Sequence, residues 1–126
     1  MTDTFDRDDR NGVFIVQAIR AHAKISKMLA CLPIPIAFQH ADVRNVAAAV
    51  TAVERAYVLI RDIPMDAGLR AEAISVMVDW LTAVTLALAA FDEDDDTGAD
   101  WMFRSAKMNV MRADVAAAEV REKLMQ

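Results

Sequence analysis

Apolar residues recur every three or four positions along most of this chain, which is the spacing of one face of an α-helix. Four stretches show the pattern, at residues 12–31, 41–61, 66–91 and 97–124. The stretches between them contain prolines or a run of acidic residues, which interrupt helices. No alternation typical of a strand competes with this pattern. The sequence therefore predicts an all-α protein with four helices.

Each predicted helix has one apolar line that should face the core. The lines are Phe14, Ala18, Ala21, Ile25, Leu29 and Leu32; then Val46, Val50, Val53, Tyr57 and Ile60; then Ile74, Met77, Leu81, Val84, Leu88 and Phe91; and finally Phe103, Ala106, Val110, Ala113, Ala117, Val120 and Leu124. The three alanines in the last line favour close approach to a neighbouring helix. Helices of 20–26 residues would be about 30–39 Å long. Such matched lengths indicate an antiparallel four-helix bundle in one domain, residues 1–126.

Residues that commonly cap helices indicate where the helices begin. Residues 1–11 are polar, and three of them could cap the first helix: Asp8, Asp9 and Asn11. We therefore expect residues 1–11 to form a polar, flexible N-terminal segment. Asp66 is suited to cap the third helix, and Thr97 with Asp100 has the form of a capping box for the fourth.

The third predicted helix has no charged residue between Asp79 and Asp92. We expect this half to be covered on nearly all sides, either at the centre of one subunit or at a dimer interface. Residues 73–91 are also long enough to raise the question of a membrane span. A carboxylate in mid-span, here Asp79, costs about 2.5–3.5 kcal/mol, so we interpret the segment as a buried helix of a protein with no membrane contact.

Composition and charge narrow the range of settings and partners. The 126 residues are 56% hydrophobic, which excludes a disordered chain, and the net charge of −5 disfavours direct nucleic-acid binding. The single cysteine, Cys31, allows no internal disulfide, and the acidic N-terminus does not resemble a secretory signal. We expect a cytoplasmic protein.

Two histidines could carry acid–base or phosphoryl chemistry. His22 lies on the apolar side of the first helix. The simplest interpretation is a side chain at the edge of the core that is hydrogen-bonded to Ser26 or to a carboxylate. The alternative is a histidine phosphotransfer site with Lys24 nearby, a role known on four-helix bundles. His40 is followed by a basic residue and an asparagine, as in some sensor-kinase phosphoacceptor boxes, but these come one residue late and so on a different helix face.

The remaining polar residues do not form a catalytic or metal-binding pattern. The acidic run at residues 92–98 fails the spacing of an EF-hand loop because Phe103 or Arg104 stands where the glutamate should be. The basic side chains of Arg20, Lys24 and Lys27 are too few for a nucleic-acid surface. We therefore expect no enzyme activity, no cofactor and no metal site, although a loose cation site in the acidic run stays open.

The apolar segment at residues 32–38 is unusual for a connection between helices. Its alternating prolines enforce an extended backbone, so it forms either a strap across the bundle end or a partner-binding surface. Exposed methionines also suit adaptable interfaces. The predicted partner-binding residues are Phe14, Ile15, Ile19, Pro33, Ile34, Pro35, Ile36, Phe38, Met108 and Met111.

This apolar excess predicts a non-enzymatic homodimer that binds a regulatory protein and inhibits or modulates it. In size and all-helical character the chain resembles the small bacterial antiactivators of LuxR-type quorum-sensing regulators. That resemblance implies a cytoplasmic transcription regulator that occupies the dimerisation or DNA-contacting surface of its partner. Two alternatives stay open, a phosphotransfer bundle and a structural subunit of a larger assembly.

Overall fold

Four α-helices make up most of the described part of the chain. A computed structural model describes the backbone of residues 2–38, 45–91 and 96–126, and the side chains of residues 11–38, 45–91 and 100–126. The helices are α1 (Thr2–Ala30), α2 (Val46–Leu59), α3 (Ala67–Phe91) and α4 (Asp96–Met125), and a short 3-10 helix, η1 (Ile60–Asp62), follows α2. The described residues contain no strand. The predicted all-α class is confirmed.

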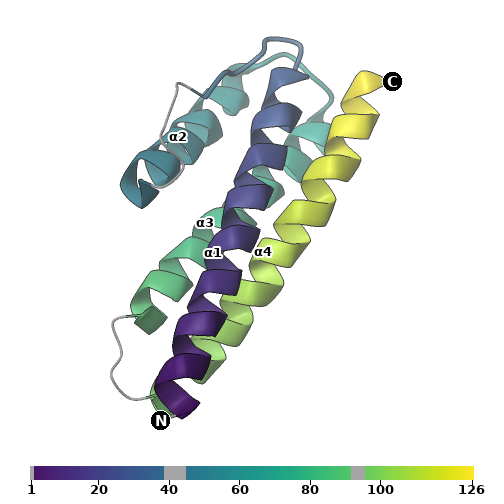
Figure 1. The fold of residues 1–126 in the computed structure, drawn as a ribbon. Coiled ribbons are helices and arrows are strands. Elements are labelled where there is room, and N and C mark those ends of the chain that lie inside the picture. The colour runs from purple at the N-terminus through teal and green to yellow at the C-terminus, as the bar shows by residue number, and fades with distance from the viewer. Residues whose placement is uncertain (1, 39–44, 92–95) are drawn as a thin grey trace.

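The three long helices pack side by side and α2 lies against one end of this group (Figure 1). α1, α2 and α4 run in one direction and α3 runs in the other. The chain reaches this order because the segment after α1 returns along α2 before α2 begins. The arrangement thus differs from a simple up-and-down bundle, in which α1 and α2 would be antiparallel.

Two predicted helix boundaries are wrong. α1 begins at Thr2, so residues 2–11 belong to the helix and the expected caps at Asp8, Asp9 and Asn11 lie inside it. This stretch has no proline, and polar residues continue a helix readily where one side faces solvent. α2 has only 14 residues because Asn45 caps it, with its side chain accepting a hydrogen bond from Ala48 N at 3.2 Å. The prediction of four rods of matched length therefore fails at α2.

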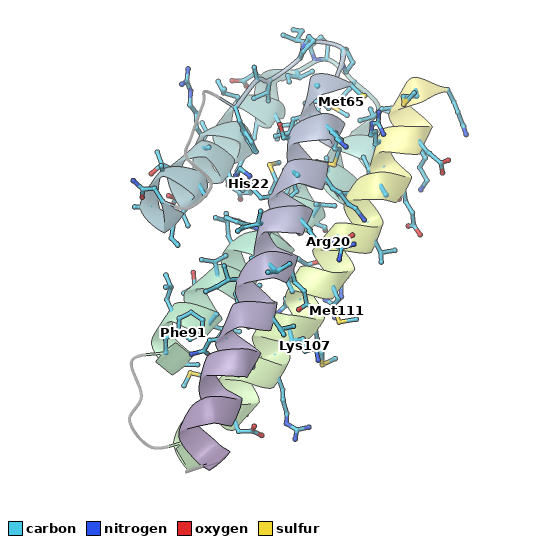
Figure 2. The ribbon with its side chains drawn as sticks, viewed as in Figure 1. Arg20, His22, Met65, Phe91, Lys107 and Met111 are labelled. Atoms are coloured by element: carbon cyan, nitrogen blue, oxygen red, sulfur yellow. The ribbon has the colours of Figure 1, made fainter. Side chains whose placement is uncertain are left out.

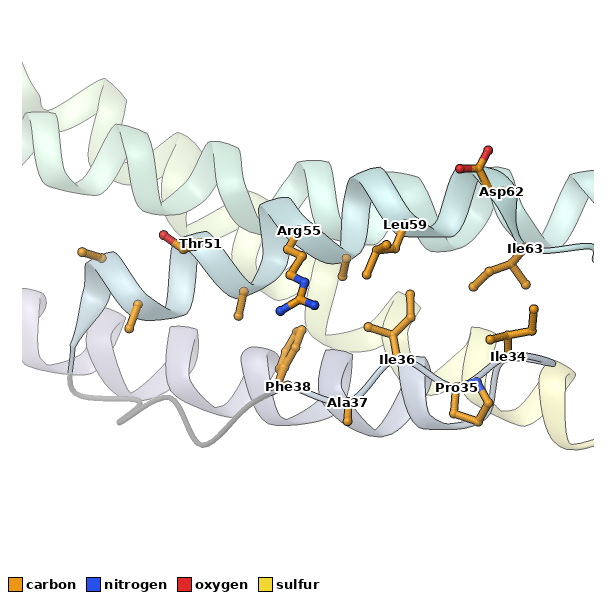
Figure 3. A pocket seen from close by; sticks show the side chains of 14 residues that line it. Ile34, Pro35, Ile36, Ala37, Phe38, Thr51, Arg55, Leu59, Asp62 and Ile63 are labelled. Atoms are coloured by element: carbon orange, nitrogen blue, oxygen red, sulfur yellow. The ribbon is translucent and has the colours of Figure 1, made fainter.

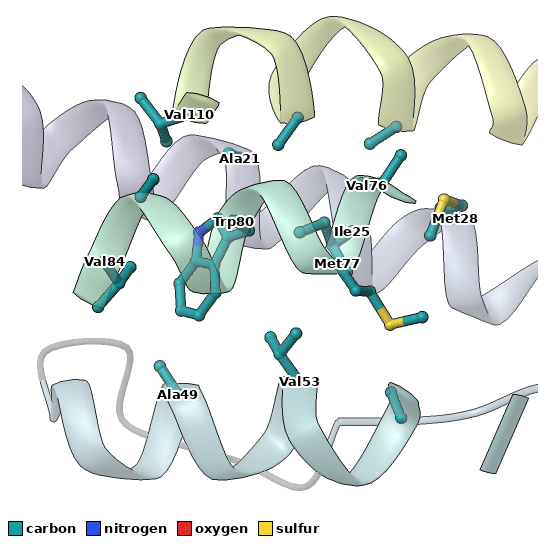
Figure 4. Close-up of a cluster of buried hydrophobic side chains, with 14 of the residues drawn as sticks. Ala21, Ile25, Met28, Ala49, Val53, Val76, Met77, Trp80, Val84 and Val110 are labelled. Atoms are coloured by element: carbon teal, nitrogen blue, oxygen red, sulfur yellow. The ribbon is translucent and has the colours of Figure 1, made fainter. Parts of the chain in front are cut away.

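The core lies between α1, α3 and α4 and extends under α2 (Figure 4). The predicted apolar line of α4 is confirmed, since all its residues are buried except the half-buried Leu124. The line of α1 is confirmed in the same way, with Ala18 half-buried. Ala106, Ala113 and Ala117 of this line are fully buried where α4 packs against α3 and α1, as expected for closely packed helices.

The buried lines of α2 and α3 are shifted from the predicted ones. α2 buries Ala49, Val53, Ala56 and Ile60, while the predicted Val46 is 44% exposed. α3 buries Ala73, Val76, Met77, Trp80, Ala83, Val84, Ala87 and Ala90, while the predicted Leu88 is 43% exposed. In both helices small alanines and larger residues share the buried face, and the alanines let the neighbouring helices approach closely.

Within one chain the described residues do not cover α3 on nearly all sides, so the first expected arrangement is wrong, and its burial at a dimer interface stays a prediction. α3 contacts all three other helices, but a strip of small or hydroxyl-bearing residues stays exposed: Ser75, Val78, Thr82, Thr85 and Ala89. Uncharged residues of this size can face water at little cost. α3 also has the length and a mean hydropathy, 1.9, that fit a membrane span, properties which core helices of soluble proteins share.

Ion pairs link the long helices at their edges. Asp79 and Glu72 of α3 pair with Arg112 (3.6 Å) and Lys123 (3.0 Å) of α4. Lys24 of α1 pairs with Asp114 of α4, so one cation of the basic side of α1 is neutralised within the chain. At the start of α3, Asp66 accepts a hydrogen bond from Leu69 N at 2.9 Å, which confirms the predicted cap.

Candidate protein-interaction surface

The short length of α2 leaves part of the surface between α1 and α3 uncovered. Beyond Val46, the first residue of α2, an apolar groove with a volume of about 210 Å³ opens between the two long helices. We call it the α1–α3 groove. Its lining residues are Phe14, Ile15, Ala18, Ile19, His22, Val46, Ala49, Trp80, Val84, Ala87, Leu88 and Phe91.

Aromatic rings stiffen one end of the α1–α3 groove. Phe14 contacts Phe91 edge-on at 6.4 Å between ring centroids and Phe103 at 5.9 Å, so α1, α3 and α4 are joined there. Phe14 itself is buried, whereas Ile15 is 48% exposed and Leu88 43% exposed. The groove therefore has a fixed aromatic floor and two aliphatic side chains, one on each helix, that water can reach.

The other end of the groove is closed by Trp80, His22 and Phe38. Trp80 Nε1 donates a hydrogen bond to the backbone oxygen of Ala18 at 3.0 Å, which ties α3 to α1. The His22 ring lies 5.2 Å from the Trp80 ring and 4.8 Å from the Phe38 ring. Phe38 comes from the segment after α1, so this cluster joins the extended segment to the long helices.

Burial sets the protonation state of His22. The side chain is only 4% exposed, and desolvation lowers its pKa below the usual 6.5, while a hydrogen bond with the Ala49 backbone acts in the opposite direction. Its Nε2 atom is buried without a hydrogen-bond partner among the described residues. The ring is thus held neutral and acts mainly as an aromatic contact.

The geometry of His22 bears on its two sequence interpretations. The prediction of a core histidine agrees with its burial, although Trp80 and Phe38, rather than Ser26, are its ring neighbours. A phosphoacceptor would need its imidazole nitrogen open to a phosphodonor, and Nε2 is covered here. His40 lies outside the described residues. The structure therefore gives the phosphotransfer interpretation no support.

The predicted strap packs along α2 and borders a second, wider groove (Figure 3). This strap–α2 groove has a volume of about 780 Å³ and lies between residues 34–38 and the outer side of α2. Ile36 N donates to Leu29 O at 3.1 Å, and Ile36 and Phe38 are half-buried, while Ile34 is 55% exposed. Arg55 and Asp62 bring charge to its rim (Figure 3). The segment is both a strap and an exposed apolar surface.

The structure divides the predicted partner-binding residues into three groups. Phe14, Ile15 and Ile19 meet in the α1–α3 groove. Ile34, Pro35, Ile36 and Phe38 line the strap–α2 groove, and the exposed Pro33 lines neither groove. Met108 and Met111 lie on the outer side of α4, with exposures of 63% and 51% (Figure 2 labels Met111). The ten residues therefore do not form one site.

Sequence reasoning missed the α3 side of the α1–α3 groove. It assigned Val84, Leu88 and Phe91 to a fully covered core line, and it assigned Trp80 no role. The signal that reveals them is the length of α2, which is too short to cover all of α3. That length depends on the Asn45 cap and cannot be seen in the apolar spacing alone.

The remaining candidate sites lie only partly within the described residues. Among the residues that the structure describes, no group of histidine, cysteine or carboxylate side chains is arranged to hold a metal ion. Cys31 is half-buried at the end of α1. The acidic run and the side chain of Thr97 fall outside the described residues and side chains, and α4 begins one residue earlier than predicted, at Asp96.

Comparisons with family models, with curated proteins and with solved structures found no match. The candidate site is therefore interpreted from the geometry of this chain.

Proposed function

We propose that this protein is a non-enzymatic helical interaction module that binds a regulatory protein and inhibits or modulates it. The observation that carries the proposal is the α1–α3 groove, an apolar channel left open because α2 is half the length of its neighbours. Ile15, Val46 and Leu88 are each more than 40% exposed along it. A contiguous apolar recess of this kind is typical of surfaces that bind other proteins.

The shape of the groove favours a helix as its ligand. Two packed helices leave a valley between them, and a third helix that fills the valley completes the packing that α2 provides further along. By helical geometry, the exposed positions beside the groove are Val16 and Ala23 on α1 and Thr85 and Ala89 on α3, all uncharged. We therefore expect a partner helix with apolar residues at positions i, i+4 and i+7, chosen by shape more than by charge.

The resemblance to antiactivators suggests the class of partner. Proteins of that kind act by covering the dimerisation or DNA-contacting surface of a transcription regulator. A helix taken from such a surface would suit the α1–α3 groove. We accordingly propose a helical segment of a regulatory protein, of the LuxR type in the first instance, as the ligand, with the bound complex formed in the cytoplasm.

Site-specific photocrosslinking tests the proposal in the cells that make the protein. A benzophenone amino acid is placed at Leu88 or at Ile15, and at Val58 on α2 as a control, because Val58 is 58% exposed and lines neither groove. We expect one protein to crosslink from both groove positions and not from position 58. Peptide mapping should place the crosslink on an amphipathic helix of that protein.

Charged substitutions in the groove provide a second test of the proposed function. In Ile15→Glu/Leu88→Glu the fold should persist because both side chains are already partly in water, and the crosslinked protein should no longer copurify. Val58→Glu should copurify it as the wild type does. The proposal fails if the double variant retains the partner, or if positions 15, 58 and 88 capture the same set of proteins.

A further inference from the structure

The outer side of α4 carries a second regular line of residues, separate from the buried one. Its positions follow one another at alternating steps of three and four: Trp101, Arg104, Met108, Met111, Val115, Ala118, Glu122 and Met125. Six of the eight are apolar. We call this line the α4 outer stripe.

The α4 outer stripe faces solvent along its whole length. The exposed fractions are 63% for Trp101 and Met108, 51% for Met111, 60% for Val115 and 65% for Met125. Large apolar residues are exposed singly on most proteins, but a repeat of 3.5 residues that continues for more than three heptads is the pattern of a coiled-coil seam. The buried seam of α4 already contacts α1 and α3, so the stripe has no partner in the described part of the chain.

We propose that the α4 outer stripe pairs with the same stripe of a second copy of this chain, with the two α4 helices antiparallel. A seam that repeats every 3.5 residues keeps facing one other helix as the two wind around each other. A second copy supplies a helix of matching length and matching spacing. The inference does not depend on the α1–α3 groove, which lies on other elements.

One register places complementary residues opposite each other. With Met108 opposite Met111 of the second copy, Arg104 faces Val115 and Trp101 faces Ala118. The largest side chain of the stripe then meets the smallest, and the aliphatic stem of the arginine packs on valine while its Nε stays bonded to Asp100 of its own chain at 2.8 Å. Six such layers cover residues 101–118 of both copies, a length of about 26 Å at 1.5 Å per residue.

The charges on one flank of the stripe favour the same register. The flanking positions are Asp100, Lys107, Asp114 and Arg121. In the antiparallel pair, Asp100 approaches Arg121 of the second copy and Lys107 approaches Asp114 of the second copy, so every contact on this flank joins opposite charges. Asp114 already pairs with Lys24 of its own chain, and Lys107 of the second copy would extend that pair.

The other arrangements bring like charges together. Sliding the antiparallel pair by one heptad in one direction sets Asp114 against Asp114 and Lys107 against Arg121. The opposite slide sets Lys107 against Lys107 and Asp100 against Asp114. A parallel pair sets Lys107 against Arg112 and Asp114 against Glu119. Charge pattern and side-chain size therefore select one orientation and one register.

Sedimentation equilibrium tests the dimer and the surface that forms it. We expect the wild type to have twice the chain mass of 13.9 kDa, and Met108→Glu/Met111→Glu to have the mass of one chain. The control Val58→Glu should remain dimeric, and circular dichroism should show equal helix content in all three. A monomeric wild type at high micromolar concentration, or a Met108→Glu/Met111→Glu variant that is still dimeric, would overturn the proposal.

Disulfide trapping tests the orientation. In a Cys31→Ser background, one chain carries Arg104→Cys and another carries Val115→Cys, and the two are mixed and oxidised with oxidised glutathione. In the proposed register positions 104 and 115 face each other across the seam, whereas two copies of position 104 are about 16 Å apart along the axis, beyond the reach of a disulfide. The crosslink should form only in the mixture. Crosslinking of either chain with itself alone would contradict the antiparallel register.

Discussion

The two halves of the surface between α1 and α3 differ in what covers them. In the covered half, α2 lies over Ile25 of α1 and Met77 of α3, and both are fully buried together with Val53 of α2 (Figure 4). In the open half, beyond Val46, Ile15 and Leu88 are each more than 40% exposed. The same two helices, with apolar residues at the same density, thus form a core at one end and a groove at the other.

This contrast shows what apolar spacing can and cannot decide. Spacing identifies the face of a helix that avoids water, and it does so equally well in both halves. Whether that face is covered by the same chain depends on the length of a neighbouring element. Here the cap at Asn45 sets the start of α2, and Ile15 and Leu88 beyond it stay exposed in the described part of the chain.

Removing a side chain from the covered half should have the largest effect. Met77→Ala leaves a cavity among fully buried neighbours and should lower the free energy of unfolding by about 2–5 kcal/mol. Val78→Ala, at the next and 42% exposed position, is the matched control and should change it by less than about 0.5 kcal/mol. Urea denaturation measures both. Equal losses in the two variants would show that α2 does not seal this half.

Enlarging a small residue in the α3–α4 contact should have the next largest effect. Ala113 is fully buried on the face of α4 that packs against the other long helices, and Ala113→Leu should cost about 1–3 kcal/mol through overpacking. Ala71→Leu on α3 provides the control for the unfolding measurement, since Ala71 is exposed and lies outside both grooves and the α4 outer stripe. An unchanged midpoint for Ala113→Leu would mean that the helices are further apart than the structure shows.

A smaller, pH-dependent effect should arise where the two halves meet. The pKa of His22 is lowered in the folded protein, so below about pH 6.5 the unfolded chain binds more protons and stability falls as the pH falls. Above the pKa of His22 in the unfolded chain, the full contribution of its titration to the stability of the fold is present. Below that pKa, the slope of the unfolding free energy against pH cannot exceed about 1.4 kcal/mol per pH unit for one proton. The groups around His22 are the uncharged Phe38, Ala49 and Trp80.

His22→Phe keeps the ring and removes the titration, so its unfolding free energy should be less dependent on pH between 4 and 7 than that of the wild type. His40 is present in both proteins and its contribution cancels in the difference. Parallel pH profiles for the two proteins would mean that His22 titrates normally.

The smallest stability effect should come from the open half. Leu88→Ser removes a side chain that is already partly in water, and we expect a loss below about 0.5 kcal/mol by thermal or urea unfolding. A loss comparable to that of Met77→Ala would place Leu88 in the core and close the groove that the proposed function requires.

The sequence predicted the long helices best. The buried line of α4 was predicted correctly because its residues repeat at steps of three and four, and the charged Lys107, Arg112 and Asp114 lie off that line. α2 was predicted less well because valine and alanine occur on several of its sides. α1 was predicted too short because aspartate and asparagine are common helix caps, and the same residues also occur inside a helix.

The candidate site was predicted only in part. Ile15 and Ile19 were predicted as partner-binding residues, and the structure brings them together with Leu88 of α3 along the α1–α3 groove. The spacing of apolar residues could not predict that Ile15 and Leu88 share one groove, because this depends on the direction of α3 and on where α2 begins. Met108 and Met111 lie on a different surface, the outer side of α4, because spacing along one helix does not show which other helices lie beside it.

The way α2 is attached also has a kinetic consequence. It is packed mainly on α3, through the single line Ala49, Val53, Ala56 and Ile60, whereas the three long helices contact one another on two sides. α2 and its strap should therefore open as a unit at a lower free-energy cost than global unfolding, and their amide hydrogens should exchange first. A ligand that also contacts Val46 would slow that exchange, so binding at the groove would be detectable on the backbone of a neighbouring helix.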